Sequence, residues 1–285
     1  MDERKLKLIE DLVLEASENK KNVLIFGEEG SGKEHTARLI HQSSTYKDNP
    51  FVVVNITTIV DLEKIIPYIY KAYGGTLYLD EIGDLSLDQQ EYLIDILEKI
   101  IIESKLISDQ KEIRIIASTT KDLLNEIIKG RFRKELYKIL SQFIIELPAL
   151  REMGEEIVEI AEKFIIGYCK INRKPLKYLS QAAKEILLDY DYPQNLRELK
   201  SIIELTIITS SSSIIYLEDV YLRKNISEID ILKDERTLEE YEKIIIEHFL
   251  KKYDNRVYYV AEKLGVSKNK IYNMINKGIV SREGL

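Results

Sequence analysis

Residues 27–34 read GEEGSGKE and carry the residue types that can hold a chain of phosphates. Gly27, Gly32 and Lys33 fit the spacing GxxxxGK, in which glycines let backbone N–H groups wrap phosphate oxygens and the lysine reaches the β and γ phosphates. A helical pattern, EHTARLIHQ, follows the lysine, and a helix N-terminus there would add a favourable dipole. We therefore expect this P-loop to bind a nucleoside triphosphate through Gly27, Glu28, Glu29, Gly30, Ser31, Gly32, Lys33 and Glu34. A plain glycine turn is the alternative.

Two adjacent carboxylates end the apolar run TLYLDE, about 50 residues further along the chain. Glu34 stands where a Ser or Thr hydroxyl would ordinarily reach Mg²⁺, so the metal needs another ligand. We expect Asp80 to hold Mg²⁺ through water, and Glu81 to orient and polarise an attacking water. An Asp-Glu pair alone is usually a solvated strand end, but the P-loop upstream makes it a specific sign of nucleoside triphosphate hydrolysis.

Five short apolar runs between residues 22 and about 147 must position these side chains. The runs VLIFG, PFVVVN, TLYLDE, IRIIAST and FIIELP alternate with longer stretches of helical period. Apolar strands separated by helices are typical of a parallel sheet that is covered on both faces and binds ligands at the carboxyl ends of its strands. The sequence therefore predicts an α/β nucleotide-binding domain over residues 1–147.

The rest of the chain has a helical pattern. In residues 148–222 the strands stop, and amphipathic runs such as EEIVEIAEKFIIGYC predict a small helical domain with a turn between helices at the serines 210–213. Residues 223–236 are polar and predict a linker. Residues 237–285 predict a short all-helical unit.

This last unit has the spacing of two short packed helices. Its first helix would bury four residues at i, i+3, i+4 and i+7, namely Val257, Val260, Ala261 and Leu264. Gly265 permits a turn, and Ser267 is a good N-cap for a second helix. That helix would pack against the first through Ile271, Met274 and Ile275. The pattern favours a helix-turn-helix, although a generic helical hairpin is the alternative.

The open face of the second helix is predicted to bind double-stranded DNA. We expect its contacts from Ser267, Lys268, Asn269, Lys270, Asn273 and Lys277. The chain carries 42 Lys and Arg against 49 Asp and Glu, a net charge of −7. Residues 251–285 carry eight basic and three acidic residues, or +5, which leaves −12 for the other 250 residues. An acidic body with a basic tail confines any nucleic-acid contact to the C-terminus.

Cysteine usage and hydropathy predict a cytoplasmic protein. Cys169 is the single cysteine, so no intramolecular disulfide can form, and the N-terminal MDERKLKLIEDL does not resemble a signal peptide. Every Ile-rich run is broken by a charged residue well before the roughly 20 apolar residues that cross a bilayer, so we expect no membrane partner.

The motifs in this order resemble the central AAA+ ATPase domain of bacterial sigma-54-dependent transcriptional activators. The resemblance rests on GEEGSGKEHTARLIHQSS, PFVVVN, GGTLYLDEIGDL, IRIIASTTKDL, GRFRKELY, LPALRE and YPQNLREL, and AEKLGVSKNKIYNMINKGI is similar to the Fis-type DNA-binding end of such activators. It implies that ATP is the nucleotide, that residues 148–222 form the helical lid, and that subunits dimerise and form a ring.

The resemblance also implies four further site residues. Asn55 would hold the catalytic Glu81 in an active or inactive orientation, and Thr120 occupies the sensor position, where Asn is common. Arg133 of GRFR would be a finger inserted into a neighbour's ATP site, and Arg197 of NLREL would sense nucleotide from the lid.

Two departures from the family pattern change the expected activity. Only eighteen residues, 56–73, lie where the family inserts a longer segment with its GAFTGA loop, which grips sigma-54. We expect a single helix over residues 62–73 in its place and no direct remodelling of sigma-54. Ile139 stands where a second arginine is frequent, so ATP binding is a firmer expectation than rapid hydrolysis. No receiver domain is expected ahead of Asn22.

Three functions remain open from the sequence. The first is a regulator that binds ATP and promoter or enhancer DNA and responds to nucleotide through ring assembly. The second is an ATP-hydrolysing activator that engages RNA polymerase through another surface, around residues 68–73. The third is a non-enzymatic paralogue that joins the rings of related, full-length activators and inhibits them.

Overall fold

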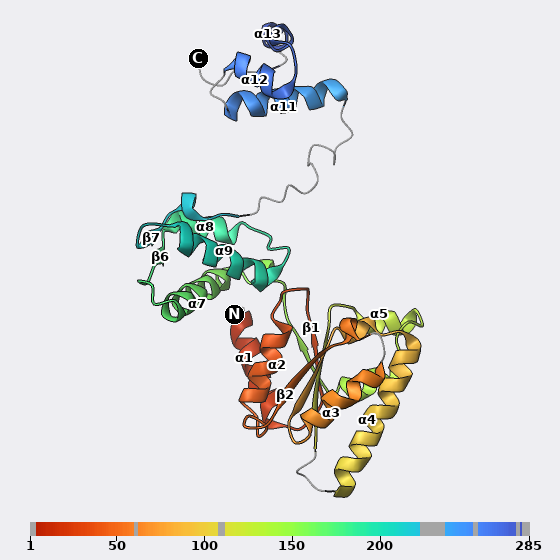
Figure 1. Cartoon of the computed structure of the whole chain (residues 1–285). Helices are drawn as coiled ribbons and strands as arrows, with labels where there is room; N and C mark the ends of the chain where they lie inside the picture. The colour runs from red at the N-terminus through yellow and green to blue at the C-terminus, as the bar shows by residue number, and fades with distance from the viewer. Residues whose placement is uncertain are drawn as a thin grey trace. The chain divides into compact units, whose positions relative to one another are not determined.

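The structure, a computed structural model, describes residues 4–59, 62–107, 112–222, 237–252, 256–277 and 280. It divides into two compact units, Met1–Leu222 and Arg223–Leu285 (Figure 1). Each unit has a hydrophobic core of its own. The predicted linker at residues 223–236 lies outside the described residues. The boundaries between the four segments drawn from the sequence stay predictions.

Five parallel strands form the centre of the first unit. They are β1 (Val23–Phe26), β2 (Phe51–Asn55), β3 (Thr76–Asp80), β4 (Arg114–Thr119) and β5 (Phe143–Glu146), in the order β2-β3-β4-β1-β5. Every neighbouring pair in this sheet is parallel. Each strand coincides with one of the five apolar runs, because a strand covered on both faces can be apolar at every position. The predicted parallel sheet is confirmed.

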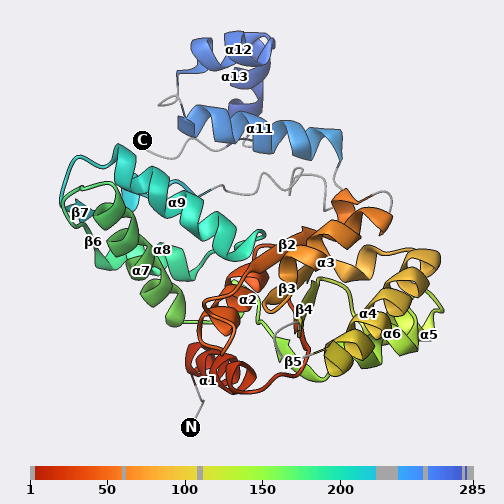
Figure 2. The ribbon, with the colours of Figure 1, turned by 60° about the horizontal axis from the view of Figure 1, so that its bottom comes forward.

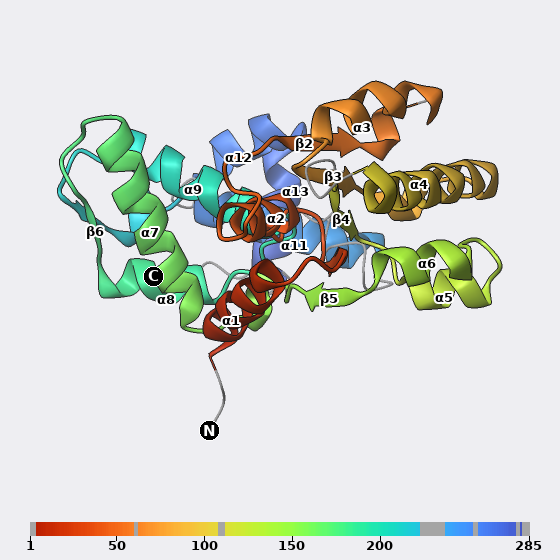
Figure 3. The same ribbon diagram turned by 90° about the horizontal axis from the view of Figure 1, so that it is seen from below.

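Helices cover both faces of this sheet. Val23 and Ile25 pack with α1 (Lys5–Glu18) and α2 (Lys33–Gln42), whereas Leu24 belongs to the core on the other face. The helices of that face are α3 (Ile66–Ala72), α4 (Leu87–Ile107), α5 (Leu123–Ile128) and α6 (Lys134–Leu140). Figure 3 shows α1 and α2 on one side of the sheet and α3 to α6 on the other. Alternation of side chains along each strand produces this three-layer arrangement.

The segment at residues 56–73 differs in part from the single helix predicted over residues 62–73. It contains 3₁₀ turns at Ile56–Thr58 and Leu62–Ile65, and only then does α3 begin. Pro67, in the first turn of α3, explains the late start, because proline has no N–H to donate to a preceding turn. The helix packs on β2 and β3.

A smaller, mainly helical part completes the first unit (Figure 2). It holds the 3₁₀ turns Leu150–Glu152 and Leu217–Asp219, the helices α7 (Glu156–Ile171), α8 (Gln181–Leu188) and α9 (Asn195–Thr209), and the strands β6 (Tyr178–Leu179) and β7 (Ile214–Ile215). The prediction that strands stop after residue 147 is wrong, because β6 and β7 form a parallel pair, and the serines 210–213 join α9 to β7 rather than to a helix. Two-residue strands are too short to show a period of two in the sequence.

The second unit contains α11 (Leu238–Lys252), α12 (Val257–Leu264) and α13 (Lys268–Asn276) among its described residues. Its core confirms the predicted stripe and includes Val257, Val260, Ala261, Ile271 and Met274, with Leu264 and Ile275 partly buried beside them. Gly265 ends α12 in the left-handed region at φ +64°, and the Ser267 side chain caps α13 by accepting a bond from the N–H of Lys270. None of the described helices is long and apolar enough to cross a membrane.

Candidate functional site

Several predicted site residues of the first unit lie at the carboxyl edge of the sheet. Strand β1 leads into the P-loop, β3 ends at Asp80, and β4 ends at Thr119. These three strands are neighbours in the sheet, so the residues at their carboxyl ends lie close together. In the sheet register, Phe26 pairs with Thr119 and Asn55 pairs with Asp80, so the ends of these strands lie side by side. The carboxyl ends of parallel strands are where open α/β sheets bind ligands.

The glycines of the P-loop are required by backbone geometry and by space. Gly30 and Gly32 have φ of +74° and +100°, a backbone region that residues with a side chain rarely adopt. A Cβ on Gly30 would lie 2.1 Å from the carbonyl oxygen of Gln194, and a Cβ on Gly27 would lie 2.6 Å from the Oγ of Ser31. The loop is therefore a compact turn before α2 that needs glycine at these positions.

The buried polar groups of the loop fit a phosphate ligand. Lys33 is 7% exposed, and its Nζ donates to the carbonyl oxygens of Gly27 at 3.0 Å and Glu28 at 3.2 Å. The Oγ of Ser31 is buried and has no hydrogen-bond partner among the described residues. An unsatisfied buried hydroxyl costs free energy unless a further group supplies its bonds, and a phosphate chain would do so.

Glu81 connects three of the predicted elements. Its Oε1 lies 3.0 Å from the Nζ of Lys33, and its Oε2 accepts bonds from the N–H of Thr120 at 2.9 Å and from its hydroxyl at 3.1 Å. The backbone of Glu81 is left-handed, with φ of +57°, which is unusual for a residue with a side chain and is common at functional sites. The predicted catalytic carboxylate, sensor residue and P-loop lysine thus lie in direct contact.

Asp80 is held from the sheet side. Its Oδ1 accepts bonds from the hydroxyls of Tyr78 at 3.0 Å and Ser118 at 2.6 Å. Burial raises the pKa of Tyr78, which keeps its hydroxyl a proton donor to this carboxylate. No described residue donates to Oδ2, so this oxygen can face a hydrated cation. Glu34 pairs with Arg38 one turn along α2, at 2.7 Å.

The side chain of Asn55 faces its own strand end. Its Oδ1 accepts bonds from the N–H of Thr57 at 2.9 Å and from the Thr57 hydroxyl at 2.6 Å, and so caps the 3₁₀ turn Ile56–Thr58. The sheet register sets Asn55 beside Asp80, one residue before Glu81. The contact between Asn55 and Glu81 that the family resemblance implies stays a prediction.

The lid contacts the P-loop through residues that do not stand out in the sequence. Arg151 makes two bonds to Glu28, at 2.9 and 2.6 Å, and Asn195 donates to the same carboxylate at 3.1 Å. These bonds, from Arg151 first and then Asn195, lower the pKa of Glu28 to about 2, so the carboxylate stays ionised at neutral pH. The only sequence signal for this cluster is its place in the motifs LPALRE and NLREL, since the partners lie more than 120 residues apart.

The two predicted arginines are both engaged within the chain. Arg197 lies 2.7 Å from Glu29 of the P-loop, in a pair with both side chains largely exposed. Arg133, the N-cap residue of α6, lies 2.6 Å from Glu91 of α4 and donates from Nε to the carbonyl oxygen of Leu87 at 3.0 Å. Exposed ion pairs of this kind contribute little to stability, so each arginine can exchange its glutamate for another anion.

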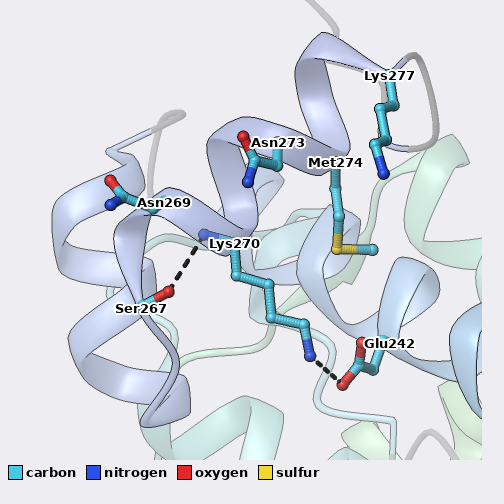
Figure 4. Close-up of a pocket in the computed structure, with 7 residues that line it drawn as sticks. All are labelled: Glu242, Ser267, Asn269, Lys270, Asn273, Met274 and Lys277. Carbon is cyan, nitrogen blue, oxygen red and sulfur yellow. Dashed lines mark hydrogen bonds and ion pairs between the residues drawn. The ribbon is translucent and has the colours of Figure 1, made fainter.

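A hollow of the second unit is lined by residues of α13 and by Glu242 of α11. Figure 4 shows it lined by Glu242, Ser267, Asn269, Lys270, Asn273, Met274 and Lys277. The residues predicted to contact DNA are all exposed, namely Ser267, Lys268, Asn269, Lys270, Asn273 and Lys277. Glu242 of α11 lies 2.6 Å from the Nζ of Lys270, so one of the exposed lysines is paired with an acid of the same unit.

Two family models match the first unit and continue past it. One, described as the Sigma-54 interaction domain, matches residues 4–150, and another, described as the AAA+ ATPase lid domain, matches residues 151–230. The solved structure of NtrX from Brucella abortus in complex with ADP superposes with a TM-score of 0.68 at 23% identity, over 97% of this chain and 68% of that one. This likeness shows the fold, which is that of an AAA+ P-loop NTPase with a parallel sheet and a helical lid.

Curated relatives are similar over most of the chain. A Geobacillus stearothermophilus protein named limonene hydroxylase is 33% identical over 92% of this chain and 53% of its own length. The transcriptional regulatory protein ZraR of Escherichia coli K12 is 31% identical over 90% and 63%, and the transcriptional activator RocR of Bacillus subtilis is 31% identical over 92% and 64%. The chain belongs to the sigma-54 interaction domain family. It spans about half to two thirds of the length of these relatives.

Proposed function

We propose that the chain is a transcription regulator that binds ATP at the P-loop and double-stranded DNA through α13. The contact of Glu81 with both Lys33 and Thr120 carries the first half of this proposal. It supports a site that couples a phosphate-binding cation to a water-orienting carboxylate. ZraR and RocR, which are named as transcriptional regulators, support the second half, as does the basic face of α13.

Each residue of the ATP site has a role that its geometry permits. The P-loop N–H groups and Lys33 would hold the phosphates, and Glu81 would orient the attacking water once the phosphates draw Lys33 away from it. Mg²⁺, held through water by Asp80, would supply charge neutralisation on the phosphate oxygens. Asn55, beside Asp80 in register, would adjust the orientation of Glu81.

The two arginines would complete the site in different ways. Arg197 would exchange Glu29 for a phosphate and so report nucleotide to the lid. Arg133 would leave Glu91 and enter the ATP site of a neighbouring subunit, which requires a ring or at least a dimer. The proposed assembly is therefore part of the catalytic arrangement, and a lone subunit would lack one cation of its site.

Turnover of ATP per subunit is expected to rise with protein concentration, and to rise further with DNA that gathers subunits, because Arg133 acts between subunits. Phosphate release measured over a concentration series, with and without DNA, tests this. Arg133→Ala should flatten the series, whereas Arg131→Ala, which removes a neighbouring arginine paired with Glu126, should leave it unchanged. A constant turnover per subunit in the unaltered chain would contradict the ring.

The DNA contacts are expected to divide between α13 residues by type. Lys277→Ala should weaken binding to all sequences alike and lower the salt slope by about one, because a lysine contacts phosphate. Asn273→Ala should blur base preference, at a cost of about 1–3 kcal/mol for the preferred base, if its amide reads a base edge. Titrations of labelled duplexes at several salt concentrations separate the two effects.

The ion pair between Glu242 and Lys270 allows a test in the opposite direction, in which DNA binding is expected to become stronger. Glu242→Gln keeps the shape of the hollow and frees the Lys270 ammonium, so DNA affinity should rise. Deletion of residues 237–285 should remove DNA binding, and equal affinity after that deletion would reject α13 as the DNA-binding element.

A second candidate function is supported by α3. Tyr70 is 64% exposed and Tyr68 39%, and both lie on this short helix, which packs on β2 and β3. This surface would suit an ATP-hydrolysing activator that engages polymerase without the missing loop. The third candidate, a paralogue that inhibits the rings of related activators, remains open because Ile139 replaces a frequent arginine.

A further inference from the structure

Asn195 is the first residue of α9, and its side chain is completely buried. Its Oδ1 accepts a bond from the N–H of Leu150 at 2.8 Å. Its Nδ2 donates to the Oε2 of Glu28 at 3.1 Å and to the carbonyl oxygen of Glu29 at 2.9 Å. The side-chain amide of Asn195 therefore joins the lid to Leu150, in the turn after β5, and to two successive residues of the P-loop. Both of its polar atoms are hydrogen-bonded.

Neighbouring backbone groups reinforce this junction. The N–H of Leu196 donates to the carbonyl oxygen of Gly30 at 3.0 Å, and Gly30 lies so close to Gln194 that no side chain would fit between them. The lid thus bonds to the carbonyls of Glu29 and Gly30 in sequence. Because a trans peptide is planar, a carbonyl held toward the lid points the next N–H away from it. The lid therefore sets the direction of loop N–H groups.

Glu28 is fixed from two sides at this junction. Arg151, in the turn after β5, binds it through both terminal nitrogens, and Asn195 binds it from the start of α9. A bidentate guanidinium holds a carboxylate in one plane, so the Asn195 amide meets an acceptor of defined position.

We propose that Asn195 is a positioning residue of the P-loop, through which the lid holds the loop in the shape that binds phosphate. The inference rests on the proposed ATP site and adds the residue that makes its affinity depend on the lid. A loop that is ordered before the ligand arrives binds more tightly, since less ordering is left to occur on binding. Loss of the amide donor loosens the loop without touching the ligand.

Two variants separate this role from a purely structural one. Asn195→Asp keeps the size, the oxygen that accepts from Leu150 and the tolerance for the left-handed backbone, at φ +50°, but sets a carboxylate against Glu28. Asn195→Gly removes all three side-chain hydrogen bonds while easing the backbone. If Asn195 were needed only because it tolerates a left-handed backbone, the glycine variant would bind ATP as tightly as the unaltered chain, or more tightly.

The full chain and both variants are compared by calorimetry with ATP and Mg²⁺ and by hydrogen exchange of residues 27–34 without nucleotide. We expect both variants to unfold cooperatively, to bind ATP about tenfold or more weakly, and to exchange their loop amides faster. Adding Glu28→Gln to Asn195→Asp should restore part of the affinity, because the new amide can donate to the new carboxylate. A contact that served stability alone would give no such rescue.

Failure of this inference differs from failure of the ATP site. ATP affinities within twofold of the unaltered chain in both variants, while Lys33→Ala has lost binding, would overturn the role of Asn195 and leave the ATP site standing. If the unaltered chain binds no ATP, the site itself is rejected, and the exchange data still decide on Asn195. Unchanged exchange of the loop amides in both variants would then overturn the coupling.

Discussion

Replacing Lys33 with alanine is expected to abolish ATP binding. Its Nζ is the one cation that the structure buries within the P-loop, where it bonds to the carbonyls of Gly27 and Glu28 and to Glu81. A charge-assisted contact to phosphate in a nearly buried site is strong, so the affinity should fall by about a hundredfold or more. Calorimetry with ATP and Mg²⁺ measures the change.

Glu81→Gln is the companion variant and should separate binding from chemistry. Glutamine keeps the size of the side chain and can accept the bond from the N–H of Thr120, but it cannot polarise water as a carboxylate does. ATP binding should persist while phosphate release stops. Lys129→Ala, which removes an exposed lysine paired with Glu126, serves as a control for charge loss and should change neither. Unchanged ATP affinity in Lys33→Ala would show that GEEGSGKE is only a turn.

The chain is not expected to open a sigma-54 promoter complex by itself. Force reaches a target only through an element that both touches it and moves with the phosphate. Residues 56–73 number eighteen, and two helices of about ten residues each, at 1.5 Å of rise per residue, would exceed that length before any projecting loop was built. The described part of the segment holds 3₁₀ turns and the short helix α3, in which Ile69 and Ala72 are buried on the sheet.

An in vitro open-complex assay tests this expectation. It uses sigma-54 polymerase, a promoter that bears the chain's own binding site, and ATP, with an activator that carries the longer segment as the positive control. The positive control should give ATP-dependent opening and this chain none. Robust opening by this chain without another activator would reject the expectation and favour the second function, in which Tyr68 and Tyr70 of α3 engage polymerase.

The sheet could be predicted from the sequence because its strands are apolar at nearly every position. The P-loop could be predicted because its backbone conformation and close contacts require glycine, which leaves a recognisable spacing in the sequence. β6 and β7 could not be predicted, since two residues show no period. The partnership of Glu28 with Arg151 and Asn195 was also out of reach. Its members lie 123 and 167 residues apart, and no local pattern states how a lid meets a loop.

Local competition explains why the side chain of Asn55 bonds where it does. The family resemblance suggests Glu81 as its partner, but Thr57 offers an N–H and a hydroxyl two residues away. A short Asn side chain readily closes such a turn on its own backbone. A resemblance of motifs fixes which residues are present, whereas the choice among nearby donors depends on distances that only the folded chain defines.

The ion pair between Lys33 and Glu81 gives the lysine a counter-ion within the chain. In the proposed cycle, ATP entry is then an exchange of one anion for another at Lys33, and departure of the products is the reverse exchange. The lysine is never left buried without a negative partner, which would cost several kcal/mol. In that cycle Glu81 would act as an internal competitor that eases product departure, so the group proposed to prime water for one round of hydrolysis would also reset the site for the next.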